Sequence, residues 1–166
     1  MGEPIWTQKE ILESACKFLR MQGKFTDDDY RIGSSKWINE KNVEEIIQQS
    51  QRLTAGDFFS LIDSLTRALY YIKTVSSFFN KSDISDMGET LIMRVKHGIK
   101  EDLLDLVVRI SGVGRKRGRL LHNAGIQSVI DVYSSSPIEI SNKTKIPLNV
   151  CQSIHKSAVK VKKAIT

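Results

Sequence analysis

A long run of apolar residues at helical spacing limits the fold of this chain more than any other feature. Its members recur at intervals of three and four residues over about six turns: Phe58, Leu61, Ile62, Leu65, Leu69, Ile72, Val75 and Phe79. A helix with so broad an apolar stripe has to be covered by other elements. The run therefore predicts a long helix, opened by Thr54 and Asp57, inside a helical bundle.

The rest of the chain also carries helical signals. Thr7 and Glu10 form a capping-box pattern before a helix that ends near Gly23, and Asn42 and Glu45 open a short helix. Further helices are expected over residues 85–97, 100–109, 115–123, 128–134, 137–142 and 147–163. No stretch alternates apolar and polar residues for long enough to predict a sheet. We therefore expect an all-α fold.

The segment 24–35 predicts an acidic loop, because it carries three consecutive aspartates at residues 27–29. Carboxylates that are neighbours in sequence do not converge on one cation, so a solvated loop is favoured over a metal site. Cys16 and Cys151 lie far apart, and the histidines lack metal-ligand spacing. We therefore expect neither a metal site nor a disulfide.

The charge is unevenly divided along the chain. Residues 1–98 carry 13 Lys and Arg against 14 Asp and Glu, a net charge of −1, whereas residues 99–166 carry 12 against 5, a net charge of +7. Such a basic half predicts a polyanionic partner, with nucleic acid ahead of an anionic membrane surface. A solvated lysine-rich surface is the alternative. No apolar run approaches the roughly 20 residues that span a bilayer, so we expect a cytoplasmic protein without membrane contact.

The basic half contains a glycine-rich turn between two expected helices, ISGVGRKRGRLLHNAGI at residues 110–126. We expect Gly112 and Gly114 to adopt backbone angles closed to other residues and to leave amides uncovered. Val113 would fill the gap between the helices, and Gly118 would let them approach closely. Uncovered amides at a helix start favour an anion. The turn therefore predicts a phosphate-binding site, with a turn used only for packing or protein contact as the alternative.

Four cations follow this turn: Arg115, Lys116, Arg117 and Arg119. Arg115 and Arg119 lie one turn apart, so we expect both to face solvent and to hold neighbouring phosphates, with Lys116 and Arg117 on either side. Contacts to the phosphate backbone carry no information about the base sequence. The cluster therefore predicts sequence-independent binding to DNA.

The pattern Gly-x-Gly-x-x-x-Gly-x-x-Leu over residues 112–121 resembles the helix-hairpin-helix motif of sequence-independent DNA-binding proteins, which usually has alanine where this chain has Gly118. Residues 143–147 precede another expected helix and look like a degenerate second copy without the glycines. Lys143 and Lys145 are then further candidates for DNA contact. A merely structural helical pair is the alternative for this second copy.

Six segments carry a closer resemblance, in this order: Lys36-Trp-Ile-Asn-Glu40, Gly56-Asp57, Arg94-Val95, Gly98-Ile-Lys-Glu-Asp-Leu-Leu-Asp-Leu106, Gly112-Val-Gly-Arg-Lys-Arg-Gly-Arg119 and Asn123-Ala-Gly-Ile126. They resemble the C-terminal part of archaeal superfamily 2 DNA helicases of the Holliday-junction-migration family, which act on forks and branched DNA. The resemblance covers about residues 36–134. It implies a ratchet-like helical bundle over residues 36–98 and a terminal helix-hairpin-helix domain over residues 99–166. Residues 1–35, an N-terminal helix and acidic loop, would be a remnant of the family's winged-helix unit.

The resemblance also implies roles for these regions. In the family the ratchet bundle lies against the single strand, and the terminal domain grips the strand as a brake. This chain has Arg67 where family members stack an aromatic residue on a base, and arginine can lie flat on a base or bind a phosphate. Phe59, Tyr70, Tyr71 and Phe78 could offer stacking platforms, but their helical spacing predicts core positions instead.

The sequence has no Gly-x-x-x-x-Gly-Lys-Ser/Thr phosphate loop and no acidic box for magnesium. We therefore expect no ATPase activity, no catalytic residues and no cofactor, so the chain is either a piece of a longer helicase or a motorless relative. The favoured function is a non-catalytic module for single-stranded, forked or branched DNA. The alternative is an interaction scaffold whose basic domain docks an acidic replication or repair protein.

Overall fold

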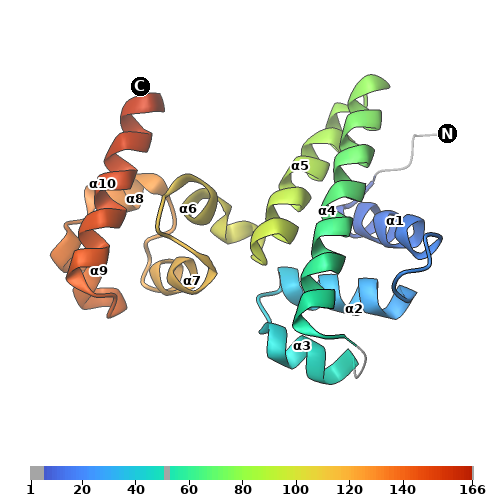
Figure 1. The fold of residues 1–166 in the computed structure, drawn as a ribbon. Helices are drawn as coiled ribbons and strands as arrows, with labels where there is room; N and C mark the ends of the chain where they lie inside the picture. Colours follow the sequence, from blue (N-terminus) through green and yellow to red (C-terminus); the bar gives the residue numbers. More distant parts are fainter. Residues whose placement is uncertain (1–5, 51–52, 166) are drawn as a thin grey trace. The chain divides into compact units, whose positions relative to one another are not determined.

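The structure is a computed structural model that describes residues 6–50 and 53–165. Helices follow one another through these residues in this order: α1 (Gln8–Arg20), α2 (Asp27–Ile38), α3 (Val43–Ser50), α4 (Ala55–Phe78), α5 (Ser82–His97), the short 3-10 helix η1 (Glu101–Leu103), α6 (Leu104–Arg109), α7 (Arg115–Asn123), α8 (Val129–Ser134), α9 (Pro137–Thr144) and α10 (Leu148–Ile165). No strand occurs in the described part, which confirms the all-α fold (Figure 1). None of the described helices is both long and apolar enough to cross a membrane.

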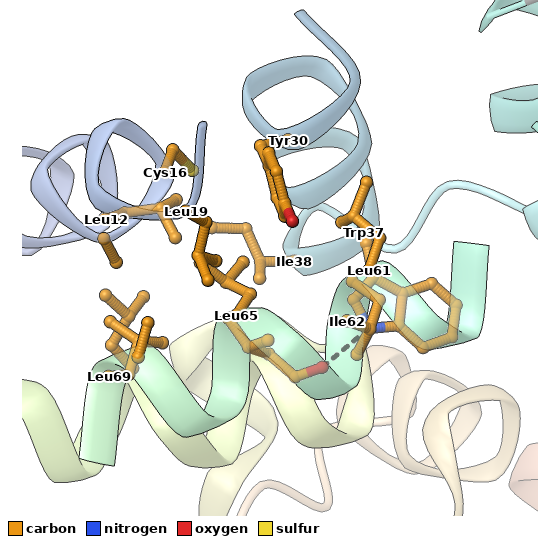
Figure 2. Packing of buried hydrophobic residues seen from close by; sticks show 14 of the residues in the cluster. Leu12, Cys16, Leu19, Tyr30, Trp37, Ile38, Leu61, Ile62, Leu65 and Leu69 are labelled. Atoms are coloured by element: carbon orange, nitrogen blue, oxygen red, sulfur yellow. Dashed lines mark hydrogen bonds between the residues drawn. The ribbon is translucent and has the colours of Figure 1, made fainter. Parts of the chain in front are cut away.

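The chain divides into two compact units, Met1–Gly98 and Ile99–Thr166, and each unit has its own apolar core. In the first unit, α4 packs between α1, α2 and α5. Figure 2 shows Leu65 and Leu69 of α4 facing apolar residues of α1 and α2. Because residues on both sides of position 35 contribute to this core, α1 and α2 are integral parts of the bundle. Residues 1–5 of the expected N-terminal region lie outside the described residues.

The apolar stripe of α4 is only partly buried. Its first five members, from Phe58 to Leu69, are at most 7% exposed, which confirms their predicted place in the core. The last two, Val75 and Phe79, are 54% and 67% exposed. Buried residues of α4 end at Leu69, so the stripe continues past the part of the helix that other helices cover. The prediction of core positions is therefore wrong for the last turns.

The expected acidic loop at residues 24–35 is wrong, because α2 begins at Asp27. Thr26 is its N-cap: the Thr26 hydroxyl oxygen accepts from the amide of Asp29 at 3.2 Å, and the Asp29 carboxylate accepts from the amide of Thr26 at 2.9 Å. Three carboxylates in the first turn also interact favourably with the positive end of the helix dipole. The aspartates therefore start a helix.

The same capping box opens α1, α2, α4, α8 and α9, in each case with Ser or Thr followed three residues later by Asp or Glu. Hydrogen bonds from Thr54 and Ser128 lower the pKa of Asp57 and Asp131 below its ordinary value. These carboxylates are therefore ionised at neutral pH and tied to the backbone.

Gly98 ends α5 in a left-handed conformation, with a φ of 62°. The indole of Trp37 lies directly against it, and the indole Nε1 donates to the carbonyl oxygen of Val95 at 2.7 Å (dashed in Figure 2). A Cβ at Gly98 would lie 2.3 Å from the indole ring. Only glycine therefore suits this position.

Candidate nucleic-acid interface

The first hairpin loop, residues 110–114, joins α6 to α7 in the second unit. Gly112 has a φ of 86°, in the left-handed region that favours glycine. Val113 is 4% exposed and belongs to the core between the helices, as predicted. Its amide donates to the carbonyl oxygen of Ile110 at 3.2 Å and closes the turn. The sequence prediction of a tight turn between two helices, with Val113 as its plug, is confirmed.

The other two glycines differ from Gly112. Gly114 has a φ of −95° and a ψ of −178°, an extended conformation that any residue adopts, so the prediction of a restricted backbone at Gly114 is wrong. A Cβ at Gly114 would meet nothing within 4 Å. At Gly118 a Cβ would lie 2.7 Å from Val107 Cγ2, which confirms that this glycine allows α6 and α7 to pack closely.

The start of α7 is not capped by a side chain. Its N-cap residue is Gly114, and no side-chain hydrogen bond caps the helix within the described residues. The first N–H groups of a helix have no intrahelical partner, and the helix dipole adds partial positive charge there. A hydroxyl and a carboxylate fill this role in the five capping boxes, whereas the start of α7, like that of α5, has no side-chain cap. A phosphate oxygen fits that role.

The first three residues of α7 are all cationic. Lys116 and Arg117 are exposed, and Arg115 is half-buried. Arg117 Nη1 donates to the carbonyl oxygen of Gly112 at 2.9 Å, which holds the guanidinium beside the loop. Three predicted site residues therefore lie at the uncapped helix start.

Arg119 is placed differently from the prediction. Its guanidinium forms a two-pronged ion pair with Asp102 of η1, at 2.9 Å for Nη1 to Oδ2 and 2.8 Å for Nη2 to Oδ1. His122 Nε2 lies 3.5 Å from the same carboxylate. The Arg119 side chain is 26% exposed, so the prediction that it faces solvent is wrong.

Asp102 neutralises much of the charge of Arg119 and was missed from the sequence. The hydrogen bond from Arg119 lowers the pKa of Asp102 below its ordinary value, so the carboxylate is ionised at neutral pH. Asp102 lies 17 residues before its partner and on another element. No local pattern indicates such a pair. Arg119 therefore ties α7 to η1 instead of standing ready for a ligand.

The second hairpin loop, residues 145–147, shares two features with the first loop when position 145 is matched to position 112, 33 residues earlier. Lys145 has a left-handed φ of 60°, in the place of Gly112. Ile146 is 3% exposed, in the place of Val113. Lys143 and Lys145 are both exposed beside this loop. The segment therefore shares a left-handed residue followed by a buried one with the first loop, and its identity as a second copy of the motif stays a prediction.

Arg67, the remaining predicted site residue, lies exposed on α4 in the first unit. Its guanidinium pairs with Asp63 one turn earlier and also donates to Ser64 Oγ at 3.2 Å. The four aromatic residues of α4 for which core positions were predicted are instead between 44% and 79% exposed: Phe59, Tyr70, Tyr71 and Phe78. That prediction is wrong, because α4 carries more apolar surface than the neighbouring helices cover.

No group of three or more His, Cys, Asp and Glu side chains in the described part of the chain could hold a metal ion. Cys16 and Cys151 are free and buried. Burial raises the pKa of the Cys16 thiol to about 11, which makes the reactive thiolate rarer than in an exposed cysteine. Both thiols therefore serve the apolar cores.

No protein-family model matches the chain. Among curated proteins, it is similar to several archaeal proteins named ATP-dependent DNA helicase Hel308. The Pyrococcus horikoshii protein is 31% identical over 121 residues, 72% of this chain, and the Thermoplasma acidophilum protein is 38% identical over 104 residues, 63% of this chain. The Methanocaldococcus jannaschii protein is 32% identical over 99 residues, 60% of this chain. The chain spans only 17%, 15% and 8% of the lengths of these three relatives.

Proposed function

This chain is related to the C-terminal region of archaeal superfamily 2 DNA helicases, as its motifs predicted, and we propose that it is a non-catalytic, sequence-independent DNA-binding module. Its ligand is the phosphate backbone of single-stranded, forked or branched DNA. The sequence has no phosphate loop for ATP, so the module contributes grip and not motor activity. It uses no metal and no cofactor.

The observation that carries this proposal is the cationic, uncapped start of α7. One phosphate oxygen accepts from the first-turn amides of α7, beside the loop that Gly112 and Val113 shape. Lys116 and Arg117 are exposed next to those amides, and Arg115 adds a third positive charge. None of these groups reads a base edge, which accounts for sequence-independent binding.

We propose two further contributions to DNA binding. Lys143 and Lys145 flank the second hairpin loop and contact a second phosphate. Arg67 on α4 contacts a base or a phosphate after leaving Asp63. Arg119 acts indirectly, because its pairing with Asp102 fixes the orientation of α7.

A second candidate function is an interaction scaffold whose basic unit docks an acidic replication or repair protein. The exposed apolar end of α4, with Tyr71, Val75, Phe78 and Phe79, favours a protein contact in the first unit. Large exposed apolar surfaces mark interaction sites more often than free surface. This candidate predicts binding to acidic polypeptides in place of DNA.

The decisive experiment is fluorescence anisotropy with labelled single-stranded, duplex and forked DNA across a salt series. With four or five phosphates contacted, the log–log slope for single-stranded DNA is about −3, at about −0.7 per phosphate. The test variant is Lys116→Glu with Arg117→Glu. Carboxylates in the first turn interact well with the helix dipole, so α7 is expected to fold in this variant.

The matched control is Lys9→Glu with Lys17→Glu, which changes the net charge equally on exposed positions of α1. We expect the Lys116/Arg117 variant to lose affinity on the order of a hundredfold and the control to keep it within a few-fold. Equal, small losses in both variants, with normal helical circular dichroism, contradict the hairpin grip. Competition by polyglutamate at low concentration, together with weak binding that does not depend on DNA form, points to the scaffold.

A further inference from the structure

One exposed face of α10 carries only polar and basic residues. Its members recur at intervals of three and four, so they share one side of the helix, and they are named here the α10 ridge: Asn149, Gln152, Ser153, Lys156, Lys160 and Lys163. The opposite face supplies Cys151, Ile154 and Ala158 to the core, and each of these is fully buried. The core therefore fixes which side of α10 faces solvent.

Within the part of the chain that the structure describes, no carboxylate pairs with the lysines of the ridge. The sequence contains no Asp or Glu after Glu139. Asp102 and Asp105 pair with arginines, and Asp131 and Glu139 cap helices, so four of the second unit's five carboxylates already serve the fold. No ion pair of Lys156, Lys160 or Lys163 occurs within the described residues. Lysines without counter-charges on a single face favour an external polyanion.

The ridge is continuous with the second hairpin loop. Lys145 lies at the end of α9 just before α10, and the ridge begins at Asn149 in the first turn of α10. At about 1.5 Å per residue, its lysines extend over about 10 Å of helix. Three lysines spread over that length, each on a flexible side chain, can each contact a different phosphate of one strand. The side-chain amides of Asn149 and Gln152 in the same row are suitable donors to phosphate oxygens.

We infer that the α10 ridge is a second DNA-contacting surface, which holds about three further phosphates of the strand and extends the grip of the hairpin loops. This inference rests on the proposed function and adds Lys156, Lys160 and Lys163 to its contact residues. A lipid surface is less suitable, because the ridge residues are polar or basic and Cys151, Ile154 and Ala158 on the opposite face are buried in the core. Lys162 lies outside the ridge, since its ammonium sits 3.9 Å above the ring of Tyr133.

The test compares two triple variants of the full chain. The first is Lys156→Gln, Lys160→Gln and Lys163→Gln, and the matched control is Lys9→Gln, Lys17→Gln and Arg20→Gln on exposed positions of α1. Glutamine keeps helix propensity, and both variants lose three positive charges. Anisotropy with an oligodeoxythymidine of about 20 nucleotides is measured across a salt series, with the Lys116/Arg117 variant alongside.

We expect the ridge variant to lose affinity on the order of tenfold or more at low salt and its slope to become shallower by about 2, while the control changes little. A ridge variant that matches the control overturns the inference and leaves the proposed function intact if the Lys116/Arg117 variant still loses binding. Loss in the ridge variant alone supports the ridge and contradicts the hairpin grip. The inference is overturned if the wild-type protein shows no salt-dependent DNA binding. It is also overturned if the ridge variant loses binding only to phosphatidylserine vesicles.

Discussion

The two units of this chain are built alike but treat their charges differently. In the first unit most cations named in ion pairs have a carboxylate within a turn of the same helix, as in Lys9–Glu13, Arg31–Asp28 and Arg67–Asp63. In the second unit four of the five carboxylates serve helix caps or the Arg109 and Arg119 pairs, and Lys143, Lys156, Lys160 and Lys163 form no ion pair within the described residues. Both units are built from helices that begin with the same kind of capping box. The fold therefore does not require the excess positive charge of the second unit. The proposed contact of the second unit with a polyanion accounts for this difference.

The units also use left-handed glycines differently. Gly98 lies under the indole of Trp37 in the first unit, whereas Gly112 lies at the open tip of the first hairpin loop. Both need a positive φ, but only Gly98 also needs the space. A buried glycine of this kind serves packing, and an open one serves access to the backbone.

The largest expected effect comes from alanine at these two positions. Gly98→Ala combines left-handed strain with a clash against Trp37, so we expect the free energy of unfolding of the first unit to fall by about 3 kcal/mol or more. Gly112→Ala meets open space and costs about 1 kcal/mol in the second unit. Denaturant unfolding followed by tryptophan fluorescence reports the first unit, because Trp6 and Trp37 are the chain's two tryptophans, and helical circular dichroism also follows the second unit. If both substitutions lower the free energy of unfolding equally, contact with Trp37 does not distinguish Gly98 from Gly112.

A second effect sharpens the comparison inside the second unit. Gly118→Ala places a methyl group against Val107 and is expected to cost about 1–3 kcal/mol, measured by circular dichroism during denaturant unfolding. Val107→Ala makes room for that methyl group. The double variant is therefore expected to be more stable than the sum of the single changes predicts. If the stability losses of the two single variants simply add in the double variant, the backbone of α7 and not the side chain of Val107 moves to accommodate the methyl group.

The smallest expected effect on stability comes from Asp102→Asn, which removes the partner of Arg119. We expect a loss of about 1 kcal/mol at pH 7, because both side chains are partly exposed and screened by solvent. Arg119 lowers the pKa of Asp102, so this stabilisation is present above the ordinary pKa of about 3.9 and is lost as the pH falls through the lower folded value. Denaturant unfolding of the wild type and the variant, at pH 7 and again below pH 4, measures how this stability difference depends on pH. A difference that persists in acid contradicts this account.

The same substitution is expected to raise affinity for single-stranded DNA a few-fold, since it removes a negative charge and releases Arg119. A variant that is less stable but binds DNA more tightly distinguishes Asp102 from a residue that only stabilises the fold. Asp63→Asn, at the exposed pair with Arg67 in the first unit, is the matched control for stability and is expected to cost less.

The sequence predicted features that depend on a few neighbouring residues. The capping patterns placed the starts of α1 and α4, and the hairpin pattern placed Val113 and Gly118 correctly. The start of α2 was also encoded locally, by Thr26 and three aspartates, but the acidic composition indicated a loop. All residues that form such a pattern lie within about one helical turn of one another, so the sequence alone shows them.

Features that depend on distant residues could not be predicted. Whether Arg119 faces solvent depends on Asp102, which another element positions. Whether Tyr71 and Phe78 are buried depends on how far the other helices of the unit extend along α4, and helical spacing does not contain that length. The ordinary conformation of Gly114 was also not predicted, because a Gly-x-Gly pattern does not show which of its glycines needs a positive φ.

The repeated capping box also has a consequence for how quickly the chain folds. Five helices have their first residue defined by a hydroxyl and a carboxylate three positions apart, so each can nucleate at a fixed place before it meets a neighbour. Nucleation is the unfavourable step in helix formation, and contacts between helices close in sequence form rapidly. We therefore expect folding on the microsecond-to-millisecond timescale of helical domains, with few opportunities for helices to form out of register.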